Sequence, residues 1–191
     1  RCANPKPFLD DLEIEGVRMI GSWFGRWPRL VIRRKGGKLG ATSRVVSLAG
    51  WSHLGQLEIG EHVYIGPGAR LFALGGITIG TGSIIGPRLT IYSSNHDFFT
   101  AATIPYSNET VSKKPVTVGL GCWLGDGVML LPGAALGDHC LVGAGSVVRG
   151  SFPPGSILTG NPARATSHLL EQQLAGKRQL LANGKFYLNP T

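Results

Sequence analysis

The sequence is poor in cysteine, in charged residues and in long hydrophobic segments, and each shortage excludes a class of protein. Its 191 residues include three cysteines, Cys2, Cys122 and Cys140, which are too few for a disulfide framework and lack metal-ligand spacing. No apolar run approaches the roughly 18 residues of a membrane-spanning helix. Charged residues make up only 16% and hydrophobic residues 42%, which argues against disorder. We therefore expect one cytoplasmic domain, either an enzyme or a binding protein.

Acidic residues are the scarcer charged group. The chain has 19 Lys and Arg against 11 Asp and Glu, a formal net charge of +8. Such a balance favours anionic partners, namely nucleic acids, phosphates or membrane surfaces. We expect no nucleic-acid partner, because the sequence offers neither an aromatic platform nor a helix suited to reading a groove.

Glycine, in contrast, is abundant, at 29 of 191 residues. Aliphatic or aromatic residues also recur at a step of six. The first stretch consists of three trios separated by steps of eight, namely Leu39, Val45 and Trp51, then Ile59, Ile65 and Leu71, then Ile79, Ile85 and Ile91; the second runs without a break through Val118, Leu124, Leu130, Leu136, Val142 and Val148. Glycine directly follows nine of these positions, and a mostly small residue stands four positions after most of them. A period of six is not helical, but it fits short strands joined by tight turns, where we expect the glycines to supply unusual backbone angles.

Three strands of six residues make one triangular coil, and we count five coils between Leu39 and about Gly150. Stacked coils bury a continuous aliphatic core, so the repeat predicts a parallel β-solenoid. The period, the glycines and the small residues together resemble the hexapeptide-repeat acyltransferases over residues 39 to about 165. This resemblance implies an all-β fold, a left-handed parallel β-helix.

The remaining segments complete the expected domain organisation. Residues 97–117 break the period and are predicted to form an excursion loop from the β-helix of residues 39–165. Residues 153–163 suggest an irregular end to the stack. From 166 to 183 leucines are spaced for a helix that ends at Gly184 and either covers the open end of the solenoid or packs on its side. The C-terminal helix and tail thus span 166–191.

The N-terminal segment, residues 1–38, is expected to be a helical cap. Between 15 and 35 the sequence favours a short helix broken near Pro28. Trp23, Phe24 and Trp27 alternate there with arginines, as in helices that bind a membrane surface. Covering the open first coil explains the same aromatic residues, and we favour this cap over peripheral membrane contact.

His96 is the main catalytic candidate. It occupies the last position of its six-residue unit, where the side chain should point outward, directly before the loop. In the maltose, galactoside and capsule-type O-acetyltransferases, which the chain resembles, a histidine directly before the excursion loop is the catalytic base. Asn95 could bind the acceptor hydroxyl or the developing oxyanion, or simply close the turn. Asp97 could orient the imidazole, but a turn contact is the preferred interpretation.

The donor site suggested by the resemblance is one for acetyl-coenzyme A. Trp123 stands at the same outward position as His96, in the first coil after the loop, and a Trp there lines the acyl-donor site in the family. Gly143 and Ala144 begin a ledge with few side chains, whose amides a pantetheine chain could reach. Arg149 and Arg164 align with basic positions near the nucleotide phosphates in the family; either could instead be a solvated charge.

Other reactive side chains are assigned structural roles. Cys122 and Cys140 occupy the small-residue positions, so we expect them in the core rather than as nucleophiles. His53, His62 and His139 lie on different coils, so we predict no metal site.

The functional prediction is an acetyl-coenzyme A-dependent O-acetyltransferase that acts on a carbohydrate hydroxyl by direct transfer, with His96 as general base. The resemblance implies a homotrimer with sites in the clefts between subunits. The alternatives are an N-acetyltransferase acting on an amino sugar, an acetyltransferase of small hydroxylated compounds, and a non-catalytic β-helix scaffold.

Overall fold

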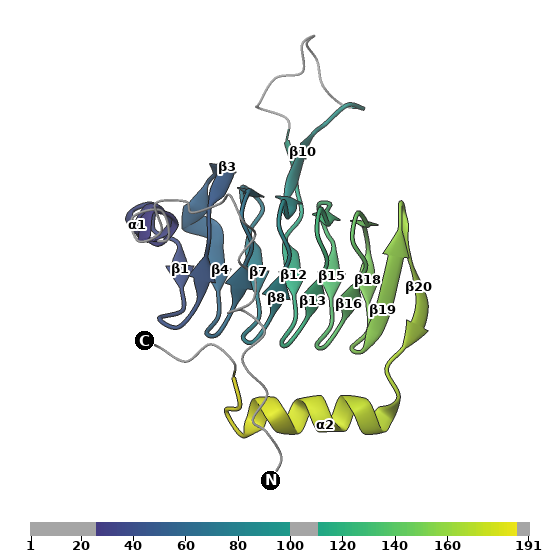
Figure 1. The fold of residues 1–191 in the computed structure, drawn as a ribbon. Coiled ribbons are helices and arrows are strands. Elements are labelled where there is room, and N and C mark those ends of the chain that lie inside the picture. The colour runs from purple at the N-terminus through teal and green to yellow at the C-terminus, as the bar shows by residue number, and fades with distance from the viewer. Residues whose placement is uncertain (1–25, 100–110, 187–191) are drawn as a thin grey trace, which may run out of the picture.

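The computed structural model describes residues 26–99 and 111–186, which form a stack of triangular coils with three walls (Figure 1). The first wall contains β1 (Lys38–Leu39), β4 (Leu57–Ile59), β7 (Ile77–Ile79), β12 (Val116–Val118), β15 (Ala135–Leu136) and β18 (Ser151–Phe152). The second contains β2 (Arg44–Val45), β5 (Tyr64–Ile65), β8 (Ile84–Ile85), β13 (Trp123–Leu124), β16 (Leu141–Val142), β19 (Ser156–Gly160) and β20 (Ala163–His168). The third contains β3 (Leu48–Ser52), β6 (Ala69–Phe72), β9 (Thr90–Tyr92), β14 (Met129–Leu130) and β17 (Val147–Val148).

Strands of successive coils pair in parallel, so that Val118 lies between Ile79 and Leu136 in the first wall. Five complete coils are followed by β18 and β19 of a sixth. A short 3-10 helix, η1 (Leu54–Gln56), joins the first two coils. The predicted parallel β-helix with helical segments at both ends is confirmed.

The core follows the six-residue period. The repeat positions from Leu39 to Val148 point inward and are buried, and the small residues between them, Cys122 and Cys140 included, fill the remaining interior. Burying aliphatic side chains stabilises a fold by about 1.5–3 kcal/mol for each one, so this continuous column is the main stabilising feature. Trp51 is the exception among these positions: it is 36% exposed and packs edge-on against Trp27.

The glycines of the repeat have a different role from the one expected. A Cβ added to Gly80 would lie 2.5 Å from the backbone of Gly119 in the next coil, and seven other glycines that follow the inward residue are confined by backbone in the same way. At the ninth, Gly143, the Cβ would lie 2.9 Å from the methyl group of Thr159. None of these nine has a positive φ. The expectation of unusual backbone angles is therefore wrong for them: glycine is required because neighbouring coils approach closely. A separate set of glycines, such as Gly82 and Gly121, adopts positive φ at the corners.

The described part of the excursion from the solenoid is a pair of strands. β10 (Ser94–His96) pairs antiparallel with β11 (Val111–Lys113), and the two strands form an arm that projects from the stack (Figure 1). The period resumes at Val116, which pairs with Ile77 of the preceding coil. The predicted loop 97–117 is thus too long at its end, because Val116 and Val118 alternate inward as a wall strand does.

The C-terminal region also departs from the prediction. Residues 156–160 and 163–168 form the antiparallel pair β19–β20 rather than an irregular end, and His168 pairs with Ser156. The helix α2 (Glu171–Ala182) therefore begins five residues later than 166. Gly184 has a φ of 63° and donates its N–H to the carbonyl of Leu181, which confirms the predicted stop.

Helix α2 packs on the side of the solenoid and does not cover its end. It runs back along the stack from β20 (Figure 1). Leu174 lies near Gly155 of the last coil, and Leu181 lies near Gly82 and Gly121 of the third and fourth coils. Phe186 continues in the same direction and stacks on His62 of the second coil, with ring centroids 3.9 Å apart.

At the other end, α1 (Arg26–Arg34) covers the first coil. The predicted break near Pro28 does not occur: Pro28 lies in the first turn, where its missing N–H would have no partner within the helix. Ile32 is fully buried in the core. Arg29 donates hydrogen bonds to the carbonyl oxygens of Gly40, Ala41 and Ser43. Trp23 and Phe24 lie outside the described residues. No helix in the described part of the chain has the length and hydrophobicity that crossing a membrane requires.

Candidate functional site

His96 ends strand β10 on the projecting arm, where the side chain is exposed as its repeat position predicts. It pairs with Val111 of β11, and Asn95 beside it pairs with Ser112. The antiparallel pairing fixes the backbone of both residues outside the wall of the solenoid. Asp97 accepts a hydrogen bond from the N–H of Phe99 at 3.1 Å, the turn contact preferred for it.

Two aromatic residues next to His96 were missed by the sequence analysis. Phe98 and Phe99 are exposed, Phe99 by 92%, and their rings meet edge-on with centroids 5.4 Å apart. The sequence contained a signal for them, namely two consecutive aromatic residues that follow the candidate base after one intervening residue. Exposed rings of this kind suit the apolar face of a ligand or another chain.

Trp123 begins β13 and points outward from the second wall, with 57% of its surface exposed. It pairs with Ile84 of the coil before and with Leu141 of the coil after. The outward positions of this wall form an apolar strip, which consists of Tyr64, Ile84, Trp123, Leu141 and Ile157.

The predicted ledge lies at the corner between the second and third walls. The N–H of Gly143 donates to Leu158, and that of Gly145 donates to Asp126 in the coil before. Ser146 is buried; its N–H donates to Gly143, and its hydroxyl accepts from the N–H of Gly160. The ledge consists of Gly143, Ala144, Gly145 and Ser146. Of these four amides, only that of Ala144 has no hydrogen-bond partner among the described residues, so the ledge offers a ligand one amide donor and not four.

The two candidate arginines lie in different places. Arg164 of β20 pairs with Thr159, whose methyl group lies beside Gly143, so the hairpin brings Arg164 next to the ledge. Arg149 follows β17 and is exposed at the corner between the third and first walls. Strand β17 therefore separates Arg149 from the ledge.

Arg88 and Asp126 form a polar pair that the sequence analysis missed. The N–H of Gly127 bonds to Pro87 and that of Gly145 to Asp126, so both residues belong to the same corner as Ala144. Arg88 Nη2 lies 2.6 Å from Asp126 Oδ2, while Asp126 Oδ1 is buried without a hydrogen-bond partner among the described residues. A carboxylate oxygen of this kind can accept a ligand N–H or O–H. The sequence did contain a signal for Asp126: it stands 18 residues, the length of one coil, before Ala144 and so occupies the same corner of the preceding coil.

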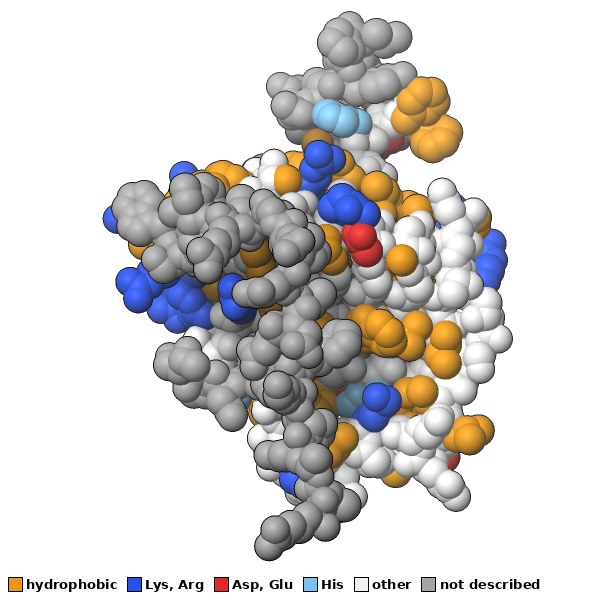
Figure 2. Space-filling model, viewed as in Figure 1, with side chains coloured by type: hydrophobic (Ala, Val, Ile, Leu, Met, Phe, Trp, Pro, Cys, Tyr) orange, Lys and Arg blue, Asp and Glu red, His pale blue; other side chains and the backbone are white. Residues whose placement is uncertain are grey.

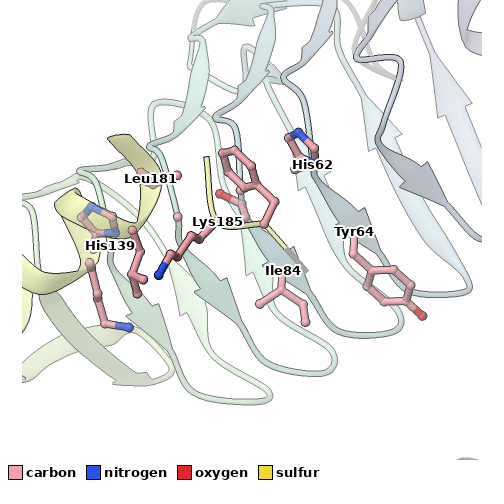
Figure 3. A pocket seen from close by; sticks show the side chains of 12 residues that line it. His62, Tyr64, Ile84, His139, Leu181 and Lys185 are labelled. Atoms are coloured by element: carbon pink, nitrogen blue, oxygen red, sulfur yellow. The ribbon is translucent and has the colours of Figure 1, made fainter. Parts of the chain in front are cut away.

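A cavity of about 310 Å³ lies elsewhere, between α2 and the corner of the first and second walls (Figure 3). His62, Tyr64, Ile84, His139 and Lys185 are among its lining residues. Burial lowers the pKa of His139. None of the candidate donor or acceptor residues lines this cavity, which is the packing surface of α2.

The other reactive groups occupy structural positions. Cys122 and Cys140 are buried in the core, as predicted. The hydrogen bond to Cys140 and burial raise the pKa of the Cys122 thiol, which disfavours the nucleophilic thiolate. Within residues 26–99 and 111–186, no group of three or more His, Cys, Asp or Glu side chains is arranged to hold a metal ion.

Comparisons with known proteins agree with this fold. The family model "Bacterial transferase hexapeptide (six repeats)" matches residues 115–150. The chain is 30% identical over 138 residues, 72% of each protein, to WcaF of Escherichia coli (strain K12), provisionally named a colanic acid biosynthesis acetyltransferase. It is 35% identical over 151 residues, 76% of this chain and 74% of the relative, to nodulation protein L of Rhizobium leguminosarum bv. viciae.

A solved structure shows the same architecture. The hexapeptide-repeat acetyltransferase VCA0836 of Vibrio cholerae O1 biovar eltor, crystallised with acetyl-coenzyme A, is 26% identical and has a TM-score of 0.64. The match covers 80% of this chain and 82% of that one. Because the coil stack and the sequence relatives agree, the chain belongs to the hexapeptide-repeat transferase family and is an acyltransferase.

Proposed function

We propose that the protein transfers an acetyl group from acetyl-coenzyme A to a hydroxyl of a carbohydrate, with His96 as the general base. The observation that carries this proposal is the exposed His96, held by antiparallel pairing on an arm outside the solenoid wall. Relatives that are named as acetyltransferases of colanic acid biosynthesis and of galactosides support the reaction and the acceptor class.

The chemistry needs one positioned base. A sugar hydroxyl is a weak nucleophile, and the imidazole of His96 removes its proton as the oxygen attacks the thioester carbonyl carbon. A C–O bond forms and the C–S bond breaks. The proton then passes from the imidazolium to the sulfur of coenzyme A, which leaves an acetyl ester and a free thiol. Asn95, next to the base, is positioned to hydrogen-bond the acceptor hydroxyl or the oxyanion.

The residues at the ledge fit coenzyme A. Ala144 supplies an exposed amide donor, and Arg164 supplies a cation for a phosphate beside it. Trp123 supplies an exposed indole face on the adjoining wall. Strand β17 lies between Arg149 and the ledge. Arg149 is therefore assigned only to the phosphates of coenzyme A that lie farthest from the ledge.

We also propose that the site forms between copies of the chain in a homotrimer. His96 lies beyond the third wall at one corner, and the ledge lies at the opposite end of that wall. The arm projects away from its own solenoid (Figure 1). A neighbouring solenoid brings its ledge to this arm without any change in either fold.

The test is a thiol-release assay with acetyl-coenzyme A and a panel of acceptors, which contains neutral sugars, amino sugars and small hydroxylated compounds. Release that requires a hydroxyl acceptor and yields an alkali-labile acetyl ester supports the proposal. Transfer only to amino groups would replace O- by N-acetylation. A stable trimer without release on any acceptor would favour a scaffold.

Arg164→Ala should raise the KM for acetyl-coenzyme A and leave the KM for the acceptor unchanged. The loss of one charge-assisted hydrogen bond costs about 1.5–3 kcal/mol, or roughly tenfold to a hundredfold in KM. The matched control is Arg70→Ala, which removes an exposed arginine of β6. If wild type and Arg164→Ala discriminate equally between coenzyme A and dephospho-coenzyme A, the 3′-phosphate is not the partner of Arg164.

A further inference from the structure

Helix α1 has two different faces. Its inner face carries Pro28 and Ile32, which are buried against the first coil. Its outer face carries Trp27 and Leu30, which remain 42% and 47% exposed. The cap requires only the inner face. Capping explains the ring contact of Trp27 with Trp51, but not the exposed area that Trp27 and Leu30 keep on this nine-residue helix.

The apolar residues of the outer face extend onto the first coil. The ring of Trp27 meets that of Trp51 edge-on, with centroids 5.2 Å apart, and Trp51 is itself partly exposed. Leu30 lies one turn after Trp27 on the same side of the helix. Together these three side chains form an apolar patch at the end of the stack.

Cations surround this patch. Arg26, Arg33, Arg34 and Lys35 are exposed, and the helix contains no acidic residue. Lys and Arg side chains gather at the end of the molecule that holds α1 (Figure 2).

Among the described residues, two carboxylates of the first two coils are already paired. Glu58 pairs with Lys38, and Glu61 accepts hydrogen bonds from the Thr42 hydroxyl and from the N–H groups of Thr42 and Ala41. These bonds lower the pKa of Glu61 to about 2. Both carboxylates are thus committed to the coils and do not pair with the cations of α1.

We propose that the outer face of α1 docks on an anionic lipid bilayer. Trp and Leu side chains enter the boundary between headgroups and acyl chains, and arginine and lysine side chains bind the anionic headgroups around them. A purely basic surface would fit nucleic acid equally well. The exposed Trp27 and Leu30 within the basic rim favour lipid.

Docking places the arm above the membrane surface, separated from it by α1, which is about 10 Å across, and by the first coils. His96 follows the third coil, so it stands two coil spacings, about 10 Å, along the stack from the first coil. A lipid-linked acceptor is within reach at that height. This last step rests on the proposed function, whereas the docking does not depend on activity.

The experiment measures sedimentation of the full chain with vesicles of phosphatidylcholine alone and of phosphatidylcholine with one quarter phosphatidylglycerol. We expect salt-sensitive binding to the anionic vesicles only. Arg34→Gln with Lys35→Gln should weaken it by about thirtyfold, since each cation near such a surface contributes about 1 kcal/mol. Leu30→Ser should weaken it by about tenfold through lost apolar burial.

Helix α2 supplies matched controls on another face of the molecule. Lys177→Gln with Arg178→Gln removes the same two charges, and Leu180→Ser removes a leucine that is 51% exposed. Both should bind like wild type. Equal weakening by the α1 and α2 pairs would reduce the effect to net charge and overturn the proposal.

Two further results would also overturn it. One is absence of binding to anionic vesicles. The other is α1-dependent binding to an oligonucleotide without vesicle binding, which would assign this face to nucleic acid. Thermal unfolding of each variant shows whether α1 still covers the first coil. If Leu30→Ser unfolds the protein, the Arg34 and Lys35 pair, which does not enter the core, still decides the question.

Discussion

His96→Ala should lower the rate of acetyl transfer by about a hundredfold or more and leave the fold intact. The side chain is exposed on the arm, so its removal creates no cavity in the core. The pairing of β10 with β11 uses the backbone and persists in the variant. The measurement is turnover at saturating acetyl-coenzyme A and acceptor, together with the thermal midpoint.

The control for this prediction is a second histidine exchange. His96→Asn keeps a polar side chain without a base, and it should lose as much activity as His96→Ala. His53→Asn is the matched variant in the first coil, where His53 is exposed with a φ of 52° that asparagine tolerates. It should keep full turnover. Near-normal turnover in both His96 variants would remove this residue from the mechanism.

Gly80→Ala should destabilise the protein by about 3 kcal/mol, which lowers the thermal midpoint by roughly 6–12 °C. Gly80 follows the buried Ile79, and a Cβ there would lie 2.5 Å from the backbone of Gly119 in the next coil. The two coils can separate only by stretching the hydrogen bond from the N–H of Gly80 to Val118. A single methyl group thus opposes the stacking of two coils.

Two other glycines separate this contact from backbone effects. Gly127 has a φ of 65° and open space around its Cβ position, so Gly127→Ala should cost only the left-handed conformation, about 1–2 kcal/mol. Gly176 lies in α2 with open space around its Cβ position. Gly176→Ala should therefore stabilise the protein by about 0.5–1 kcal/mol through helix propensity, which raises the thermal midpoint slightly. A Gly80→Ala protein as stable as Gly176→Ala would disprove the close approach of the coils.

The sequence was sufficient to predict the coil stack because one physical requirement recurs at every coil. Ile79, Val118 and Leu136 each face the interior at the same place, so their spacing records the geometry directly. The reason for the glycines was not available from the sequence. Turn angles and close approach both select glycine, and only the position of the neighbouring coil distinguishes them.

The segments outside the repeat were predicted less well. Thr166 to His168 favour no single structure by composition, and their pairing with β19 depends on an open strand edge that exists only after the stack has formed. The candidate site was also predictable only in part. The outward position of His96 follows from the period, whereas the Arg88–Asp126 pair joins residues 38 positions apart across the excursion. The loss of two ledge amides, those of Gly143 and Gly145, to neighbouring coils likewise requires the stack itself.

The closing hairpin of β19 and β20 has a consequence for self-association. A stack of parallel coils presents open strand edges at each end, and such edges can join molecules end to end into fibres. The strand β20 reverses direction and occupies the last edge of the second wall, while α1 and Arg29 cover the first coil. The last edge of the second wall is therefore closed to another coil, whereas β18 and β17 are the last described strands of the other two walls. The hairpin and α1 thus reduce the strand edge that a second molecule could pair with, and loss of either one should favour end-to-end association.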